Sequence, residues 1–148
     1  MCAFRYPHRR YGFTMAYRYT KESRFLDYAT NVTQYYIANL PSASVPLWDF
    51  DAPASQPYRD TSAAAITSSA LLELVEYVEP TLKPLYLETI SKQMAALSSP
   101  AYSYIGDLEA SFSVLSHNRH DCGLDGCAVV ESDYYYLEAL LRMAATQG

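Results

Sequence analysis

A row of small side chains near the middle of the chain sets the strongest limit on how it can fold. Ala63, Ala64 and Ala65 open a stretch whose apolar residues recur with a helical period as far as Val78. Alanines in the first turn of a helix let neighbouring segments approach its backbone closely. We therefore expect an inner helix at a crowded centre, where several helix N-termini converge. Such a centre is electropositive and favours an acidic ligand.

The segment before these alanines is predicted to be an irregular loop. Its prolines, Pro46, Pro53 and Pro57, fix φ and remove backbone donors. The loop ends in three side chains that can accept the free N–H groups at the start of the next helix, namely Asp60, Thr61 and Ser62.

Two interpretations of the tryptophan in this loop stay open. Trp48 is the only tryptophan of the chain, and beside the inner helix it is placed to stack on the face of a sugar. Alternatively, Trp48 fills the core and Arg59 forms an ion pair with Asp60 or Asp49.

The remaining periodicity predicts further helices and no sheet. No segment shows sustained alternation of apolar and polar residues, so the predicted fold class is all-α. Further helical stripes or helix-like compositions mark the ranges Tyr11–Tyr19, Glu22–Leu40, Ser62–Val78, Leu85–Leu97, Glu109–Ser116 and Asp133–Thr146.

Length and composition exclude several classes of protein. The 148 residues are about one domain, and the net charge of −5 argues against binding to nucleic acid. No apolar run approaches the roughly 20 residues that span a bilayer, so no membrane segment is predicted. The first residues lack the apolar core of a signal peptide, which favours a cytoplasmic location. The 15 tyrosines suit a polar cavity, a sugar site or half-buried packing.

A loop near the end of the chain gathers possible metal ligands. It holds His117, His120, Cys122 and Cys127. This mixture suits Zn²⁺, but the spacing is not that of a standard zinc finger, and a Cys122–Cys127 disulfide is a second possibility. The favoured interpretation is a polar loop, so neither a metal nor a cofactor is predicted.

Several segments together resemble the unsaturated glucuronyl hydrolases of glycoside hydrolase family 88. They are "YGFTMAYRYTKESRFLDYA", "VPLWDFDAP", "YRDTSAAAITSSALLEL" and "SDYYYLEALLR", in the order of the family. The resemblance covers Tyr11 to Met143 and implies a partial (α/α)6 barrel of the six-hairpin glycosidase type. About five or six of the twelve barrel helices would be present. Residues 1–10 would be a divergent segment, and residues 11–148 the C-terminal half of the barrel domain.

The family removes a 4,5-unsaturated uronic acid from the non-reducing end of oligosaccharides made by polysaccharide lyases. The resemblance implies an unsaturated uronic-acid oligosaccharide as the ligand. The side chains expected at the barrel mouth are Trp48, Asp49, Arg59, Asp60, His117 and Tyr134, with Tyr11 and Phe13 as weaker candidates.

The chain also departs from the family pattern. "FRYPHRR", Phe4 to Arg10, stands where the family has a motif of tryptophan, arginine and glutamine. Glu131 replaces a tyrosine and adds a carboxylate that would weaken binding of an anionic sugar. The essential aspartates of the family lie upstream of the matched part. No residue of this chain is therefore predicted to be catalytic, and the chain alone is predicted to be inactive.

Two functions of different classes follow. The first is a fragment of an unsaturated glucuronyl hydrolase. The second is a non-catalytic helical module that binds an acidic sugar or a partner protein. Half of a closed barrel would leave the flanks of its first and last inner helices uncovered, and such apolar surfaces favour self-association.

Overall fold

The computed structural model describes residues 5–105, 113–119, 125–127 and 129–145. These residues contain five helices, which confirms the all-α class. Their bounds are α1 Arg5–Thr20, α2 Ser23–Ala38, α3 Thr61–Leu74, α4 Lys83–Leu97 and α5 Val130–Ala145.

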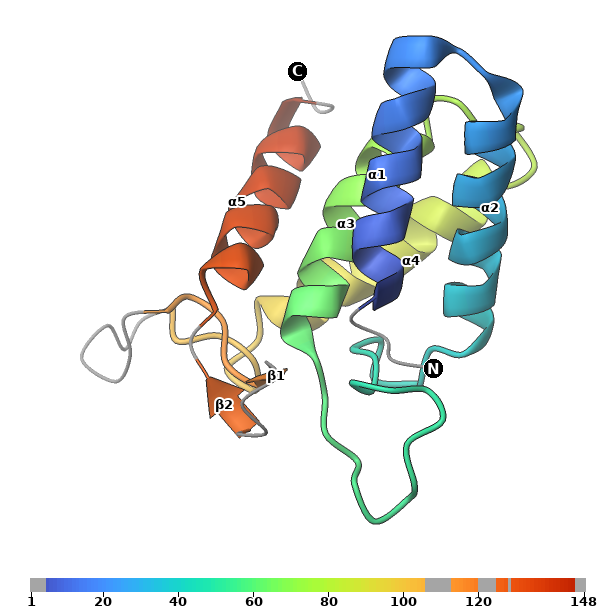
Figure 1. Cartoon of the computed structure of the whole chain (residues 1–148). Helices are drawn as coiled ribbons and strands as arrows, with labels where there is room; N and C mark the ends of the chain where they lie inside the picture. Colours follow the sequence, from blue (N-terminus) through green and yellow to red (C-terminus); the bar gives the residue numbers. More distant parts are fainter. Residues whose placement is uncertain (1–4, 106–112, 120–124, 128, 146–148) are drawn as a thin grey trace.

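The five helices form two antiparallel hairpins, α1–α2 and α3–α4, and a fifth helix, α5, that packs on α3 (Figure 1). The helix α3 packs between α1 and α5, while α2 packs on α1 and α4 packs on α3. The helices α1, α3 and α5 run in the same direction and begin at the same end of the molecule, whereas α2 and α4 run the opposite way. This is an inner row of parallel helices with outer helices behind it, as expected for part of a barrel.

The centre of the fold is α3, all of whose residues are buried. Its small side chains make this possible: Ala63, Ala64 and Ala65 have no exposed surface. The buried hydroxyl of Thr67 donates to the carbonyl of Ala63 at 2.6 Å, so this polar group is satisfied within the helix. The crowded inner helix predicted from the alanines is confirmed.

The aspartate before α3 is its N-cap. The Oδ1 atom of Asp60 accepts from the backbone N–H of Ala63 at 3.2 Å and from the hydroxyl of Ser62 at 2.6 Å. The carboxylate thereby satisfies a donor of the first turn and offsets the positive helix end. The loop before α3 can therefore approach the crowded centre without leaving this N–H group unpaired.

The structure differs from the predicted elements in three places. Residues Ser113–Ser116 are not helical, because Leu115 forms a β-bridge with Ser103; the rest of the helix predicted from Glu109 lies outside the described residues. Two short antiparallel strands, β1 Asn118–Arg119 and β2 Asp125–Cys127, are too short to show an alternating pattern. Finally, α1 begins at Arg5, before the predicted helical range Tyr11–Tyr19.

The sequence predicted no membrane-spanning segment, because none of its apolar runs is long enough to cross a bilayer. Across the ranges that the structure describes, no helix is both long enough and apolar enough to cross a bilayer.

Replacing the N-cap tests its contribution to the fold. We expect Asp60→Ala to lower the free energy of unfolding by about 1–2 kcal/mol, because the N–H group of Ala63 loses its acceptor. Asp60→Asn keeps an acceptor oxygen and should lose clearly less. Urea unfolding of the two variants measures the difference, and equal losses would show that the acceptor oxygen is not the source of the stabilisation.

Candidate functional site

The loop between α2 and α3 folds back on itself and brings four of the predicted site residues together. The backbone N–H of Trp48 donates to the carbonyl of Tyr58 at 3.0 Å, and that of Asp60 donates to the carbonyl of Pro46 at 3.0 Å. A β-bridge joins Leu47 to Arg59. Because of this pairing, Trp48, Asp49 and Arg59 all lie beside the capped start of α3.

The side chains of this loop differ in burial. Trp48, Asp49 and Arg59 are half-buried, whereas Asp60 is fully buried. The guanidinium of Arg59 donates to the carbonyl of Val45 at 3.1 Å. This bond holds the arginine against the loop by a neutral acceptor, and not by the ion pair with Asp60 or Asp49 that was one of the two open interpretations.

His117 reaches the same place from a distant part of the sequence. Its carbonyl accepts from the backbone N–H of Thr61 at 3.3 Å, and the hydroxyl of Thr61 donates to the carbonyl of Ser116 at 2.6 Å. The imidazole is exposed and meets the ring of Tyr102 edge-on at 5.8 Å. The backbone of His117 has a φ of 56°, a left-handed conformation that is uncommon outside glycine. The two hydrogen bonds from Thr61 thus fix the backbone of His117 at the start of α3.

An aspartate of α5 positions the segment that leads to His117. The carboxylate of Asp133 accepts from the backbone N–H groups of Val114 and Leu115, at 3.0 and 3.1 Å, and from the hydroxyl of Ser113 at 3.1 Å. Nothing in the sequence indicates this role, because the acceptor and its three donors lie about twenty positions apart with no spacing motif.

Tyr134 lies apart from this group. It is exposed on α5, and its ring meets that of Tyr135 edge-on at 5.0 Å. The side of α5 that is buried carries Ser132, Tyr136 and Ala139. With 3.6 residues per turn, Tyr134 points roughly away from that side. Its predicted contact with substrate stays a prediction.

The two weaker candidates on α1 have different surroundings. Tyr11 meets Tyr135 edge-on at 5.2 Å, and its hydroxyl donates to Glu138 at 3.1 Å. Phe13 packs instead against the rings of Phe25 and Tyr28, so its contacts are with α2. Tyr11 therefore belongs to the inner row of helices, while Phe13 fixes the first hairpin.

A partly buried ionic network, centred on the buried Glu73, joins the three inner helices. The Oε2 atom of Glu73 on α3 accepts from Arg18 of α1 at 3.2 Å and from Arg142 of α5 at 3.1 Å. Glu138 of α5 accepts from Arg142 at 3.4 Å and from the hydroxyl of Ser69. This network was not predicted from the sequence. Its one signal was Glu73, a charged residue within an otherwise apolar or small helix.

The network also shifts the ionisation of its members. Burial and the negative charge of Glu138 raise the pKa of Tyr11 to about 12. For Arg142, burial lowers the pKa, but the hydrogen bond to Glu73 and the charge of Glu138 outweigh it and the net shift is upward. Both shifts favour the protonated forms that the hydrogen bonds require.

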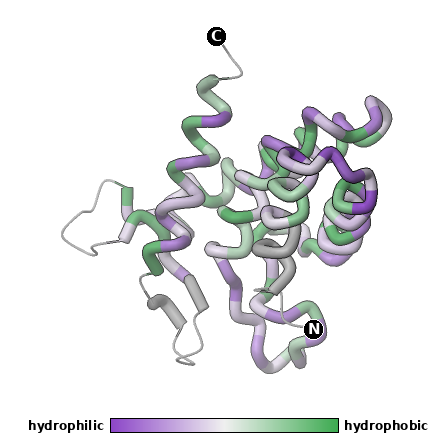
Figure 2. Tube along the Cα trace, turned by 45° about the horizontal axis from the view of Figure 1, so that its top comes forward, coloured by the Kyte–Doolittle hydropathy of each residue, from purple (hydrophilic) through white to green (hydrophobic). Residues whose placement is uncertain are grey.

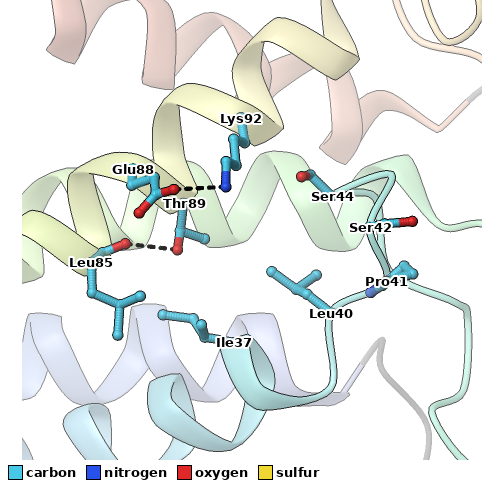
Figure 3. A pocket seen from close by; sticks show the side chains of 9 residues that line it. All are labelled: Ile37, Leu40, Pro41, Ser42, Ser44, Leu85, Glu88, Thr89 and Lys92. Atoms are coloured by element: carbon cyan, nitrogen blue, oxygen red, sulfur yellow. Dashed lines mark hydrogen bonds and ion pairs between the residues drawn. The ribbon is translucent and has the colours of Figure 1, made fainter.

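Two surface cavities among the described residues lie away from the predicted site. The one in Figure 3 has a volume of about 330 Å³ and lies between α2, α4 and the start of the loop that follows α2. Leu85 and Ile37 line it, and Glu88 and Lys92 form an ion pair of 2.7 Å at its edge. The second, of about 440 Å³, is lined by residues of α2 and the segment 77–82. Neither cavity includes a predicted site residue.

The zinc and disulfide alternatives rest on residues that the structure does not describe. His120 and Cys122 lie outside the described residues, and so does the side chain of Cys127. Among the described residues, no group of three His, Cys, Asp or Glu side chains is arranged to hold a metal ion.

Curated relatives match most of this chain. It is 40% identical over 138 residues to the unsaturated glucuronyl hydrolase of Formosa agariphila, and 31% identical over 140 residues to that of Bacillus sp. strain GL1. It is 30% identical over 140 residues to the unsaturated chondroitin disaccharide hydrolase of Streptococcus pyogenes. These alignments cover 89–90% of this chain but only 34–36% of the relatives. No family model matches the chain.

Solved structures show the same relationship. An unsaturated glucuronyl hydrolase specific for heparin superposes with a TM-score of 0.88 at 32% identity, over 98% of this chain and 40% of that one. The Bacillus sp. GL1 hydrolase gives a TM-score of 0.86 at 28% identity, over 97% and 39%. A mutant of the Streptococcus agalactiae hydrolase in complex with dGlcA-GalNAc6S gives 0.87 at 28% identity, over 97% and 39%.

The chain thus spans about a third of the length of its curated relatives, which is less than the half expected from the sequence. Five described helices in about 40% of the solved chains fit part of a barrel with twelve helices. The C-terminal position of the chain within such a barrel stays a prediction.

Neutralising the central carboxylate tests the ionic network. We expect Glu73→Gln to lower the free energy of unfolding by about 2 kcal/mol, because Arg18 and Arg142 lose their shared charged acceptor. Glu76→Gln, at an exposed position just beyond α3, is the matched control and should change stability little. Chemical denaturation compares the two, and equal effects would contradict a stabilising network.

The raised pKa of Tyr11 predicts a loss of stability in alkali. Above the ordinary tyrosine pKa of 10.0 the unfolded chain releases this proton, while the folded chain keeps it until about pH 12. The contribution is complete below pH 10.0 and is lost as the pH rises towards 12. Tyr11→Phe should therefore lose less stability over this range than the wild-type chain. Urea unfolding at a series of pH values measures both, and parallel curves would argue against the shift.

Proposed function

We propose that the chain, which is similar in sequence and fold to part of the unsaturated glucuronyl hydrolases, forms one wall of the substrate-binding mouth of such an enzyme. The observation that carries this proposal is the match of 97–98% of the chain to solved hydrolases. The parallel inner helices, which begin at one end, support it. The proposed ligand is an oligosaccharide that ends in an unsaturated uronic acid.

The residues beside the start of α3 have the chemistry that such a ligand needs. The guanidinium of Arg59 is the cation for the uronate carboxylate, since arginine binds carboxylates through paired donors. The half-buried ring of Trp48 offers an apolar face for a sugar ring. The exposed imidazole of His117 supplies a polar contact. Asp49 and Asp60 shape the loop and the helix end around these three.

The carboxylate of Asp60 is poorly placed to perform the reaction itself. A general acid must come within hydrogen-bond distance of the reacting atom. Asp60 is fully buried and accepts bonds from Ser62 and Ala63 as an N-cap. We therefore propose that the catalytic aspartates come from a part of the enzyme outside this sequence, and that the chain alone does not turn over substrate.

A chimaera tests the proposal. This chain would replace its aligned third in the Formosa agariphila hydrolase, and the ultraviolet absorbance of the unsaturated uronate would report hydrolysis of a disaccharide. We expect turnover by the chimaera and none by the chain alone. A chimaera that folds but neither binds nor hydrolyses the disaccharide would overturn the proposal.

The role of Arg59 has its own test in this chimaera. Arg59→Ala should raise KM by at least about tenfold, because an ionic hydrogen bond to the substrate is lost. Arg24→Ala, which removes an exposed guanidinium on α2, is the control and should leave KM unchanged. Steady-state kinetics and thermal unfolding are measured together. If KM and kcat both stay unchanged for Arg59→Ala in a folded protein, the arginine does not contact substrate.

A second candidate is a non-catalytic helical module that binds an acidic sugar or a partner protein. The observation that favours it is the exposed apolar side of α5, which includes Leu137 and Leu141. In this case the chain would associate with itself through the flanks of the partial barrel. Binding of the disaccharide to the isolated chain without turnover, together with a dimeric mass, would favour it. A cytoplasmic location stays a prediction from the sequence.

A further inference from the structure

A buried glutamine on α4 contacts the beginning of the loop between α2 and α3. Gln93 has no exposed surface. Its amide nitrogen donates to the carbonyl of Ser44 at 3.1 Å and to the hydroxyl of Tyr36 on α2 at 2.6 Å. Its amide oxygen accepts from the hydroxyl of Ser68 on α3 at 3.3 Å. One buried side chain therefore connects three helices to the loop.

The contact with Ser44 requires a donor on the glutamine. A main-chain carbonyl only accepts hydrogen bonds, so the NH2 end of the Gln93 amide must face the loop. Ser44 also has a φ of 62°, a left-handed conformation that is uncommon outside glycine. Such a conformation persists only where its surroundings hold it. The hydrogen bond from Gln93 holds this turn, together with the backbone bond from the N–H of Ser44 to the carbonyl of Pro41 at 2.9 Å.

Packing between this part of the loop and α4 is incomplete. The cavity of about 330 Å³ lies between them, and Ser42 and Ser44 line it from the loop, opposite Thr89 and Lys92 of α4 (Figure 3). Figure 2 shows that hydrophobic and hydrophilic positions are mixed along the loop, so it presents no continuous apolar side to the helices. The hydrogen bond from Gln93 therefore supplies a fixed contact that packing does not provide here.

The residue after Ser44 passes this restraint on to Arg59. Val45 is fully buried and precedes Pro46, and a residue before proline is confined to extended backbone conformations. Once Gln93 fixes the peptide group between Ser44 and Val45, the next carbonyl has one main direction. That carbonyl, of Val45, accepts from the guanidinium of Arg59 at 3.1 Å. Gln93 and Arg59 thus bind two consecutive carbonyls of the same turn.

We propose that Gln93 is a positioning residue for Arg59, which sets the direction in which the guanidinium meets the uronate carboxylate. The inference rests on the proposed function, which takes Arg59 to contact the substrate. The bond to Val45 occupies one N–H group of a guanidinium that has five, so donors remain for a carboxylate. Loss of the Gln93 amide leaves the arginine present but misdirected. Such a change weakens substrate binding and spares the chemical step.

A double-mutant cycle in the chimaera with the Formosa agariphila hydrolase tests this role. Gln93→Met removes the amide donors and keeps an unbranched side chain of similar length. It is compared with Arg59→Ala and with the double variant. Steady-state hydrolysis of the disaccharide gives KM and kcat, and hydrogen–deuterium exchange reports the opening of residues 44–60. Glu73→Gln, which weakens the fold near the other end of α3, is the control for a general loss of stability.

We expect Gln93→Met to raise KM about threefold and to leave kcat unchanged, because a hydrogen bond that orients the guanidinium is lost. In the Arg59→Ala background it should not raise KM further, since it acts through the arginine. Exchange in residues 44–60 should become faster with Gln93→Met and stay unchanged with Glu73→Gln. If Gln93→Met does not fold, Gln93→Glu replaces it, because an ionised carboxylate of the same shape has no donor for Ser44.

The outcomes separate the positioning role from the proposed function. Equal increases in KM from Gln93→Met with and without Arg59 overturn the positioning role, because the glutamine then acts independently of the arginine. An increase in KM for Arg59→Ala, with none for Gln93→Met, supports the function and overturns the positioning role. Unchanged exchange in residues 44–60 also overturns it. A chimaera that does not bind the disaccharide, but whose loop exchanges faster with Gln93→Met, contradicts the function and supports the control of the Arg59 loop by Gln93.

Discussion

One carboxylate near the C-terminal end of α3 fixes the relative positions of the inner helices. Glu73 is nearly buried, and its Oε2 atom is shared by Arg18 of α1 and Arg142 of α5. A buried charge is tolerated only when it is paired, so the two arginines must reach it whenever α3 is enclosed. This requirement sets the relative positions of three helices, while apolar packing alone would allow them to slide.

The two ends of α3 therefore have different structural roles. Near its C-terminal end the ionic network holds α1, α3 and α5 together. At its N-terminal end Asp60 caps the helix, and the backbone N–H and the hydroxyl of Thr61 donate to the distant segment that carries His117. Asp133 of α5 holds that segment from the other side. The proposed sugar site thus consists of loops, but each loop is fastened to a helix whose position the network determines.

The sequence predicted the features that depend on local composition. The small residues Ala63 to Ala65 indicated the inner helix, and Asp60 was among the predicted caps. What it could not show were contacts between distant positions. Glu73 stood out as a charge in an apolar helix, but nothing in the sequence identified its two arginine partners. The side of α5 on which Tyr134 lies also depended on knowing which neighbours cover that helix.

The complete burial of α3 has a consequence for how the molecule opens. All of its residues are enclosed by α1, α4, α5 and the loops. An amide proton exchanges with solvent only after its hydrogen bond breaks and water reaches it. For α3, water can reach the backbone only after the α1–α2 and α3–α4 hairpins have separated from each other. Deuterium uptake by this helix would thus report the rarest openings of the protein, while α2, with many exposed positions, would report frequent local ones.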